Sequence, residues 1–423
     1  MKTIVYNYPY EVDNKNAGIE IRVQKELRDE ELFLLKQASL DDYAQNEAWT
    51  AIGTNNQMNY SAHGIFRYFG KFPATIATHL INEYTKENDT VIDPMSGSGT
   101  TALECLLSNR KCFAFDVNPL SILLAKVKTT HLEANIIDNY FAQIKANYKP
   151  LSLDEFDYEP VGLKDIDHWF LKQTQDSIRG LIFEINKIVD AEARDFFMIC
   201  LAASLRTVSR ATSQQGRLFL DVLTAKEDCF ETFEKKVKKG IECVSSLPNN
   251  NINIHISEYS VENKYDKELF EIADLIIVHP PYFNSYKYSS VNSLELAWLK
   301  VNHASVRKNE VHEFFKVGKA ENVSKYVDDM TLALSNIGET LKKGGVMAMM
   351  IGDTVIKGEY IKATKMVIDA FIKANPDFSV EKMVLRVPKY TEASWTTSQR
   401  RETNKVGINL NDFIVIFRKG NDE

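Results

Sequence analysis

Between residues 89 and 116 the chain reads DTVIDPMSGSGTTALECLLSNRKCFAFD. The short apolar run at residues 89–93 predicts a buried strand, and the glycine-rich turn after it leads into a helix over residues 101–108. A second apolar run, residues 111–115, predicts another strand, which ends at Asp116. A strand, a glycine-rich turn, a helix, a strand and an acid in this order form the first half of a doubly wound α/β domain.

The same alternation returns in the second half of the chain. Residues 273–278 form a nearly continuous apolar run, which is typical of a central parallel strand. Residues 253–256, 344–351 and 413–417 predict further strands. Between residues 132 and 247 the pattern is helical, without an obvious strand. We therefore expect three parts: an N-terminal extension over residues 1–65, one α/β domain built from residues 66–131 and 248–423, and a helical insertion over residues 132–247.

Composition limits the class of protein. With 423 residues, 44% of them hydrophobic, the chain can bury a full core and carry a second lobe. A net charge of -7 argues against a protein coated in positive charge, so any nucleic acid must be held by a local basic surface. The first residues lack the apolar core of a signal peptide, and no stretch is apolar enough to span a bilayer. Five cysteines without a CxxC pair suggest neither a metal site nor disulfides, so a cytoplasmic protein with reduced thiols is expected.

The glycine-rich turn predicts a ligand site. Gly97 and Gly99 lie where a strand must turn sharply into a helix while its backbone approaches a ligand. Asp116 follows at close to the spacing of about 20 residues at which an acid reaches ribose hydroxyls in dinucleotide-binding folds. The turn lacks the GxxxxGK[ST] lysine and the third glycine of GxGxxG, which disfavours a triphosphate or pyrophosphate ligand. An adenosyl cofactor suits these residues; the alternatives are an ordinary tight turn and, for Asp116, a helix N-cap before Pro119.

Three segments resemble the N4-cytosine and N6-adenine DNA methyltransferases: FGKFPA at residues 69–74, VIDPMSGSGTT at 91–101 and FDVNP at 115–119. The resemblance implies a Rossmann-like methyltransferase fold, a doubly wound sheet with a helical insertion, that binds S-adenosylmethionine. By similarity, Lys71, Phe72 and Pro73 lie along the methionine end of this cofactor, and Asp116 takes its ribose. The same similarity predicts that the cofactor is contacted by Asp93, Pro94, Met95, Ser96, Gly97, Ser98, Gly99, Thr100, Thr101 and Asn118. Met95 stands where the family has an aromatic residue.

A fourth segment, LIIVHPPY at residues 275–282, runs from a buried strand into two prolines, which make the chain stiff and extended. It resembles the family's catalytic tetrapeptide, in which Asp, Asn or Ser precedes Pro-Pro-Tyr. An amino group on cytosine or adenine is a poor nucleophile because its lone pair is delocalised into the ring, so catalysis needs acceptors for its hydrogens. His279 and the carbonyl of Pro280 are the predicted acceptors, Pro281 stiffens the segment, and Tyr282 offers a face on which an extruded base stacks.

His279 departs from the family pattern. A neutral imidazole accepts one hydrogen bond and a protonated one accepts none, so activity is expected to fail at acid pH if His279 is the acceptor. The alternative interpretation of Pro-Pro-Tyr is a rigid loop with a core tyrosine. Three interpretations of His279 follow: the family's chemistry tolerates histidine at this position, the enzyme acts on a different acceptor substrate, or the activity has been lost.

Two basic segments are candidates for nucleic-acid contacts. Residues 386–405 interleave cations with aromatic side chains, which suits phosphate contacts and base stacking; the predicted contacts there are Lys389, Tyr390, Trp395, Arg400 and Arg401. A second cluster follows an apolar helix of the insertion and contains Arg206, Arg210 and Arg217. The alternative for the first segment is a solvated hairpin loop.

Together these features predict a DNA amino-methyltransferase, either from a restriction-modification or related defence setting or acting as a solitary modification enzyme. DNA is the expected partner, and restriction or defence proteins are candidate partners. Residues 66–131 and 248–423 form its catalytic domain, and the insertion is a candidate target-recognition or structural lobe. Cytosine N4 is favoured over adenine N6, because the family's cytosine members tolerate more variation at the first tetrapeptide position. Two alternatives remain: an RNA base amino-methyltransferase, and an inactive cofactor-binding module that binds nucleic acid or a protein partner.

Overall fold

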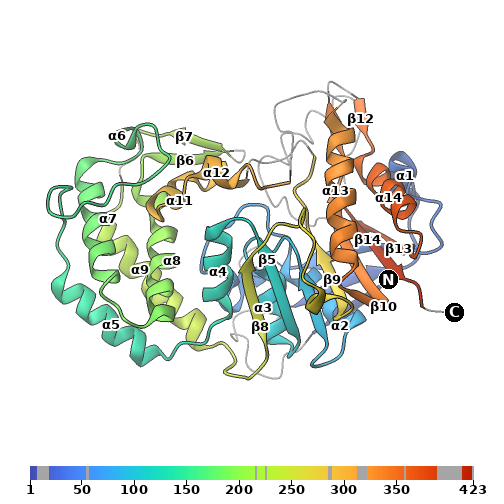
Figure 1. Cartoon of the computed structure of the whole chain (residues 1–423), viewed down its shortest axis with the longest axis horizontal. Helices are drawn as coiled ribbons and strands as arrows, with labels where there is room; N and C mark the ends of the chain where they lie inside the picture. The colour runs from blue at the N-terminus through green and yellow to red at the C-terminus, as the bar shows by residue number, and fades with distance from the viewer. Residues whose placement is uncertain are drawn as a thin grey trace.

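The chain folds into two lobes that lie side by side, one built on a large sheet and the other mostly of helices (Figure 1). The computed structural model describes residues 1–6, 19–53, 57–214, 217–223, 226–283, 288–311, 322–356, 359–387 and 412–421. Within these ranges no helix is long and apolar enough to cross a membrane. The same residues contain no cluster of three His, Cys, Asp or Glu side chains placed to hold a metal ion.

A ten-stranded sheet forms the first lobe, in the order β1-β2-β3-β13-β14-β10-β9-β4-β5-β8. Strands β8, β5, β4, β9 and β10 run parallel to one another, whereas β14 is antiparallel to both β10 and β13. The bounds are β4 Thr90–Asp93, β5 Lys111–Asp116, β8 Ile254–Glu258, β9 Ala273–Val278, β10 Leu341–Gly352, β13 Phe378–Arg386 and β14 Asp412–Lys419. The doubly wound α/β fold is thereby confirmed, and every strand predicted from the sequence is present.

Both faces of this sheet are buried, which is why β9 is apolar except for Asp274 near its start. Leu275 and Ile277 belong to the cluster that packs against α2, α3 and α4, while Ile276 and Val278 belong to the cluster on the opposite face, against α1, α13 and α14. The covering helices are α1 Asp29–Ala38, α2 Ala74–Tyr84, α3 Thr100–Leu107, α4 Pro119–Thr129, α13 Asn322–Gly338 and α14 Ala363–Ala374.

The strand order reverses between β4 and β9. From β4 the chain adds β5 and β8 in one direction, and then returns to place β9 and β10 on the other side. In open α/β sheets a crevice opens outside the carboxyl ends of the strands at such a point, and ligands bind there. The residues that follow β4, β5 and β9 are therefore brought to one edge of the sheet.

Three N-terminal strands lengthen the sheet at its other end. They are β1 (Lys2–Val5), β2 (Glu20–Gln24) and β3 (Asn46–Ile52), and β3 joins the rest by pairing in parallel with β13. Helix α1 lies between β2 and β3, and none of the three strands was predicted. Their partner in the sheet lies more than 300 residues further along the chain, since Ala48 pairs with Leu385. The division into three parts remains a prediction.

The insertion is mostly helical, as expected, with α5 Ala134–Asn147, α6 Ile166–Trp169, α7 Lys172–Ile185, α8 Ala191–Val208 and α9 Cys229–Ser245. Phe196 and Phe197 of α8 and Phe233 of α9 are fully buried in its core. The expectation that it contains no strand is wrong, because β6 (Ala211–Gln214) and β7 (Arg217–Leu220) form an antiparallel hairpin. Each strand has only four residues, too few for a clear alternation of polar and apolar side chains.

Short elements after β9 connect the two lobes. Helices α10 Tyr288–Val291, α11 Ser293–Trp298 and α12 His303–Val306 follow the Pro-Pro-Tyr segment, and a small hairpin, β11 Thr354–Ile356 with β12 Glu359–Ile361, follows β10. In Figure 1 α11 and α12 extend from the sheet lobe over the insertion, and α11 packs against α8. The insertion is thus packed against the segment next to the predicted catalytic tetrapeptide.

Candidate active site

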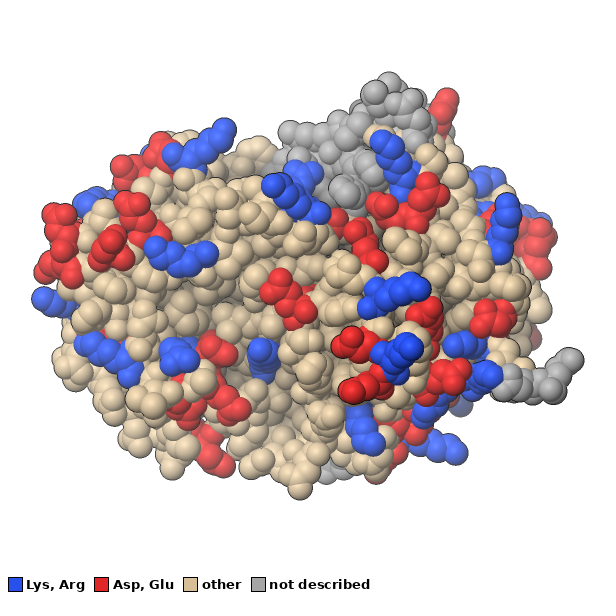
Figure 2. All heavy atoms as spheres, in the orientation of Figure 1, with Lys and Arg blue, Asp and Glu red and all other residues tan. Residues whose placement is uncertain are grey.

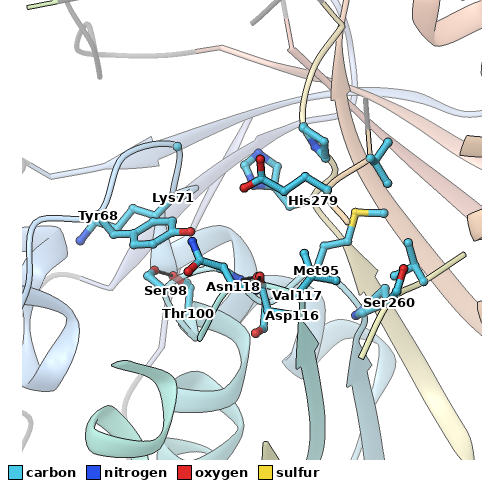
Figure 3. A pocket seen from close by; sticks show the side chains of 18 of the residues that line it. Tyr68, Lys71, Met95, Ser98, Thr100, Asp116, Val117, Asn118, Ser260 and His279 are labelled. Atoms are coloured by element: carbon cyan, nitrogen blue, oxygen red, sulfur yellow. Dashed lines mark hydrogen bonds between the residues drawn. The ribbon is translucent and has the colours of Figure 1, made fainter. Parts of the chain in front are cut away.

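A cavity opens at the carboxyl edge of the sheet, at the reversal point between β4 and β9. It has about 870 Å³ of empty space, part of which is open to solvent. In Figure 3 Tyr68 and Lys71 lie on one side of it, Met95 and Ser260 on the other, and Asp116 and Asn118 lie between them. His279 and Pro281 complete the lining from the β9 side. The cavity therefore brings the glycine-rich turn and the Pro-Pro-Tyr segment together.

The turn between β4 and α3 depends on its two glycines. Gly97 and Gly99 have φ values of 49° and 71°, in the left-handed region that other residues rarely adopt. A Cβ on Gly99 would lie 2.6 Å from the Cβ of Ala125 in α4, so the turn also packs directly against a neighbouring helix. Helix α3 begins at Thr100, directly after the turn. The predicted residues Pro94, Met95, Ser96, Gly97, Ser98 and Thr100 line the cavity, whereas Asp93, Gly99 and Thr101 do not.

Asp116 fastens this turn to the end of β5. Its carboxylate accepts hydrogen bonds from the backbone N–H of Gly97, at 2.7 Å, and of Asn118, at 2.9 Å. Burial raises the pKa of Asp116 to about 6, although the backbone hydrogen bonds oppose this shift. Burial likewise raises the pKa of Asp93 to about 7. Asp93 accepts from the N–H of Met95 and lies behind the turn, so its position is structural.

Two buried polar atoms of the cavity have no partner in the protein. Asn118 caps α4 by accepting from the N–H of Leu120, but its Nδ2 has no hydrogen-bond partner, and neither has the Oγ of Ser96. Buried polar groups are nearly always hydrogen-bonded, so these atoms indicate a polar ligand. Donors at these two positions, together with the Asp116 carboxylate, match the hydroxyls and ring nitrogens of an adenosine group.

Lys71 enters the cavity from the loop before α2. Its Nζ donates to the Oδ1 of Asn59 and to the carbonyl of His63, at 3.1 Å for the latter. Burial lowers the pKa of Lys71 to about 8, and the charge of Lys239 adds to this effect. Phe72 lies beside it and packs edge-on against the ring of His279, with 5.2 Å between centroids. Pro73, the N-cap of α2, does not line the cavity.

A buried polar network beneath the turn was not predicted. The carboxylate of Glu104 in α3 accepts from Tyr60, His63 and Thr78, at 2.6–2.7 Å. Lys128 is 1% exposed and donates to the carbonyl of Ser98 at 2.7 Å. A lone acid in the apolar helix sequence TTALECLL was the available signal, because an acid at a buried helical position needs partners.

The tetrapeptide leaves β9 as expected. His279 and Pro281 line the cavity, whereas Pro280 and Tyr282 do not. The carbonyl of Pro281 accepts from the hydroxyl of Tyr326 in α13 at 2.9 Å. Tyr282 packs edge-on against His279, with 5.5 Å between ring centroids, and its ring lies so close to Gly352 that a Cβ there would be 2.9 Å away.

Burial lowers the pKa of His279 to about 3, and the nearby charge of Arg386 adds to this effect. Arg386 is paired with Asp412 at 2.5 Å. The imidazole is therefore neutral at every ordinary pH and can accept a hydrogen bond. The expected loss of activity by protonation of His279 accordingly moves down to about pH 3.

Comparison with known proteins shows which methyltransferases the chain resembles in sequence. Residues 4–126 match a family model described as DNA methylase, of the N6/N4 type. This part of the chain is thus similar to the N6/N4 DNA methylases. It is 23% identical over 305 residues to the type II methyltransferase M.MvaI of Kocuria varians, covering 64% of this chain and 65% of that protein. It is 24% identical over 281 residues to M.BsoBI of Geobacillus stearothermophilus, covering 59% and 55%. The chain thus spans between about half and two thirds of the length of these two methyltransferases.

Among solved structures, the chain resembles a geranyl diphosphate methyltransferase in complex with SAM, with a TM-score of 0.34 and 6% identity over 82% of this chain and 85% of that one. It also resembles TrmN from Thermus thermophilus, with a TM-score of 0.33 and 10% identity over 83% and 50%.

Several residues of this cavity were missed by sequence reasoning. They come from four segments: the loop before α2 (Tyr68 and Gly70), the turn after β5 (Val117), the loop after β8 (Tyr259, Ser260 and Val261) and the loop after α12 (Asn309, Glu310 and Val311). The segment after β8 was predictable in principle, since β8 ends at the same edge of the sheet as β4 and β5. No motif marks residues 309–311, which only the packing of α12 brings to the cavity.

Only some of the predicted nucleic-acid contacts lie among the residues that the structure describes. Arg206 forms a salt bridge with Glu295 of α11, at 2.9 Å, and donates a hydrogen bond to the carbonyl of Val291. It therefore links the insertion to the segment after the tetrapeptide. Arg210 donates to the carbonyl of Asp167, and Arg217 lies in β7. Lys389, Tyr390, Trp395, Arg400 and Arg401 lie outside the described residues. On the face drawn in Figure 2 the described Lys and Arg side chains alternate with Asp and Glu, and the nucleic-acid contacts remain predictions.

Proposed function

We propose that this chain transfers a methyl group from S-adenosylmethionine to an exocyclic amino group of a base in DNA. The observation that carries the proposal is the single cavity lined by both the glycine-rich turn, with Gly97 and Asp116, and the tetrapeptide, with His279 and Pro281. The DNA methylase model that residues 4–126 match and the similar type II methyltransferases support DNA as the substrate.

The residues around the turn fit the methyl donor. The unpartnered Asn118 Nδ2 and Ser96 Oγ, with the Asp116 carboxylate, form a polar site for the adenosine end. Lys71 offers a positive charge for the carboxylate of the methionine end, and Phe72 offers an apolar contact. When bound, the donor supplies an electrophilic methyl group. The protein's part is to hold the amine and this methyl group in line, since positioning and electrostatics provide most of the acceleration.

At the other end of the cavity, His279 accepts a hydrogen from the amine of the target base. Its imidazole is neutral and therefore has a ring nitrogen with a free lone pair. An exocyclic amine lies inside the duplex, so the base must be extruded to reach this cavity. Tyr282, held edge-on to His279 and against Gly352, provides a flat surface near this position. Cytosine N4 is the proposed target, with adenine N6 as the alternative.

In the direct test, the purified protein is incubated with labelled S-adenosylmethionine and one of three substrates: duplex DNA made by PCR, tRNA or rRNA. The PCR-made DNA carries no methylated bases. We expect label in the DNA alone, and mass spectrometry of its nucleosides to detect N4-methylcytosine. N6-methyladenine would change the base assignment. Label in RNA would replace DNA by RNA as substrate, and no label with any substrate, despite donor binding, would favour the inactive module.

Donor binding should have a bell-shaped pH dependence. Lys71 pairs with the methionine carboxylate only when protonated, below its pKa of about 8, and Asp116 accepts from ribose hydroxyls best when ionised, above its pKa of about 6. Calorimetry with S-adenosylhomocysteine should therefore give the highest affinity between pH 6 and 8. Beyond these limits the affinity should fall by up to about tenfold per pH unit.

Matched variants assign the two limbs of this profile. Lys71→Gln should flatten the alkaline limb and leave the acid limb, while Asp116→Asn should do the reverse. Any alkaline limb that persists in Lys71→Gln comes from the amino group of the ligand. A wild-type affinity that stays constant from pH 5 to 9 would contradict both assignments.

Gly352→Ala should lower methyl transfer without weakening donor binding. The new Cβ would lie 2.9 Å from two ring carbons of Tyr282 and 3.0 Å from the Oδ1 of Asp412, so the ring must shift. A displacement of about 1 Å in a positioned group can cost about 100-fold in rate. Turnover with saturating DNA is the measurement. Gly420→Ala is the control, because its Cβ would meet only the carbonyl of Asp377, at 3.3 Å. Equal turnover in the two variants would exclude a role for the Tyr282 position.

A further inference from the structure

The cavity contains a carboxylate that the proposed mechanism does not use. Among the described residues that line it, the acids are Asp116 and Glu310. Asp116 is held by the backbone N–H groups of Gly97 and Asn118 at the β5 side. Glu310 comes from a different part of the chain, the loop after α12, and it lines the cavity together with His279 and Pro281.

Glu310 is attached to the segment that follows the tetrapeptide. Its Oε1 accepts from the backbone N–H of Ser289 at 3.1 Å, and its Oε2 accepts from the Ser289 hydroxyl at 3.0 Å. Ser289 is fully buried in α10, and α10 packs against α12 and β7. The carboxylate is thus fixed by two hydrogen bonds at the wall of the cavity, and the hairpin of the insertion contacts the helix that fixes it.

The chemistry of an amine needs more than His279 provides. An exocyclic amine carries two hydrogens, and a neutral imidazole accepts only one hydrogen bond. The nitrogen also becomes positively charged as it forms its new bond, and it must then lose a proton. His279 is a poor base for this proton, because its buried imidazole disfavours the charged form.

We propose that Glu310 is a catalytic residue that accepts the second hydrogen of the target amine and removes its proton during methyl transfer. The inference rests on the proposed function of the cavity. A bond forms between the amine nitrogen and the methyl carbon while the carbon–sulfur bond breaks, and its electron pair stays on sulfur, which becomes a neutral thioether. The nitrogen loses one proton to the Glu310 carboxylate, which releases it to solvent. The carboxylate charge also stabilises the positive charge that develops on the nitrogen.

The competing explanation is structural, because Glu310 also caps the short helix α10. Two variants separate the roles. Glu310→Gln keeps an oxygen that can accept from the Ser289 N–H and an amide that can bond the hydroxyl, but it removes the negative charge. Ser289→Ala removes the hydroxyl contact and keeps the charge, so it is the matched control.

Turnover is measured with labelled S-adenosylmethionine and PCR-made duplex DNA, and the dissociation constants of S-adenosylhomocysteine and DNA are measured separately. We expect Glu310→Gln to lose about 100-fold or more in kcat, as for the loss of a general base. Both dissociation constants and the melting temperature should stay at their wild-type values. Ser289→Ala loses one of the two contacts that hold Glu310 but keeps the backbone N–H contact and the charge, so its loss of kcat should be at least about tenfold smaller than that of Glu310→Gln.

Wild-type kcat in Glu310→Gln would overturn the proposal and leave the proposed function intact. Equal losses of kcat and melting temperature in both variants would overturn it in favour of the helix cap. A wild-type protein that binds S-adenosylhomocysteine but methylates no DNA would overturn the proposed function itself, and the role of Glu310 with it.

Discussion

Gly99→Ala is expected to abolish binding of the methyl donor and to lower the free energy of unfolding by about 2–5 kcal/mol. The new Cβ would lie 2.6 Å from the Cβ of Ala125 and 2.9 Å from its Cα, distances at which one backbone must move. The φ of 71° adds the strain of a left-handed conformation. Because Gly99 is the N-cap of α3, a shift there changes the whole turn that forms one wall of the cavity.

Gly97→Ala is the matched control for this prediction. Its φ of 49° imposes similar backbone strain, but its Cβ would meet only the ring of Tyr68, at 3.5 Å, which is an ordinary contact. We expect a loss of about 1–2 kcal/mol from strain alone. Urea unfolding gives both free energies. If Gly99→Ala were no less stable than Gly97→Ala, the close packing of the turn against α4 would be disproved as the reason for the glycine.

The core of the fold was predictable because its signals are local. β4, β5 and β9 are short apolar runs, and the turn after β4 contains two glycines. Each of these features follows from a backbone or burial requirement of its own segment. The order of such segments along the chain is enough to predict a doubly wound sheet.

Features that depend on distant partners were not predictable in the same way. Strand β3 exists as part of the sheet only because β13 lies beside it, and nothing in NEAWTAI specifies that partner. The β6–β7 hairpin was missed because its strands have four residues each. The first of them, ATSQ, also lacks the apolar run that identified the equally short β4.

The cavity shows the same contrast. Gly97, Asp116 and His279 were found because each lies at or shortly after the carboxyl end of a strand, and the carboxyl ends of parallel strands meet at one edge. Glu310 follows a four-residue helix, and the packing of α10 and α12 is what brings it to the cavity. A single acid in a polar loop carries no signal in the sequence.

His279→Ala is expected to lower methyl transfer by about 100-fold or more, which is the usual cost of losing one preorganised hydrogen-bonding group. The imidazole is neutral, lines the cavity, and is held between the edges of Phe72 and Tyr282. Its removal deletes the acceptor but leaves the glycine-rich turn untouched. The affinity for S-adenosylhomocysteine should therefore be that of the wild type.

His279→Asn is the matched variant, because its carboxamide oxygen is a neutral acceptor and asparagine occurs at this position in the family pattern. We expect it to retain at least about ten times the turnover of His279→Ala, since one good acceptor contributes roughly that much. Pre-steady-state transfer to PCR-made duplex DNA measures the chemical step without product release. Equal rates for the wild type and His279→Ala would remove His279 from the mechanism. A faster rate in His279→Asn than in the wild type would instead mean that histidine at this position lowers the rate of methyl transfer.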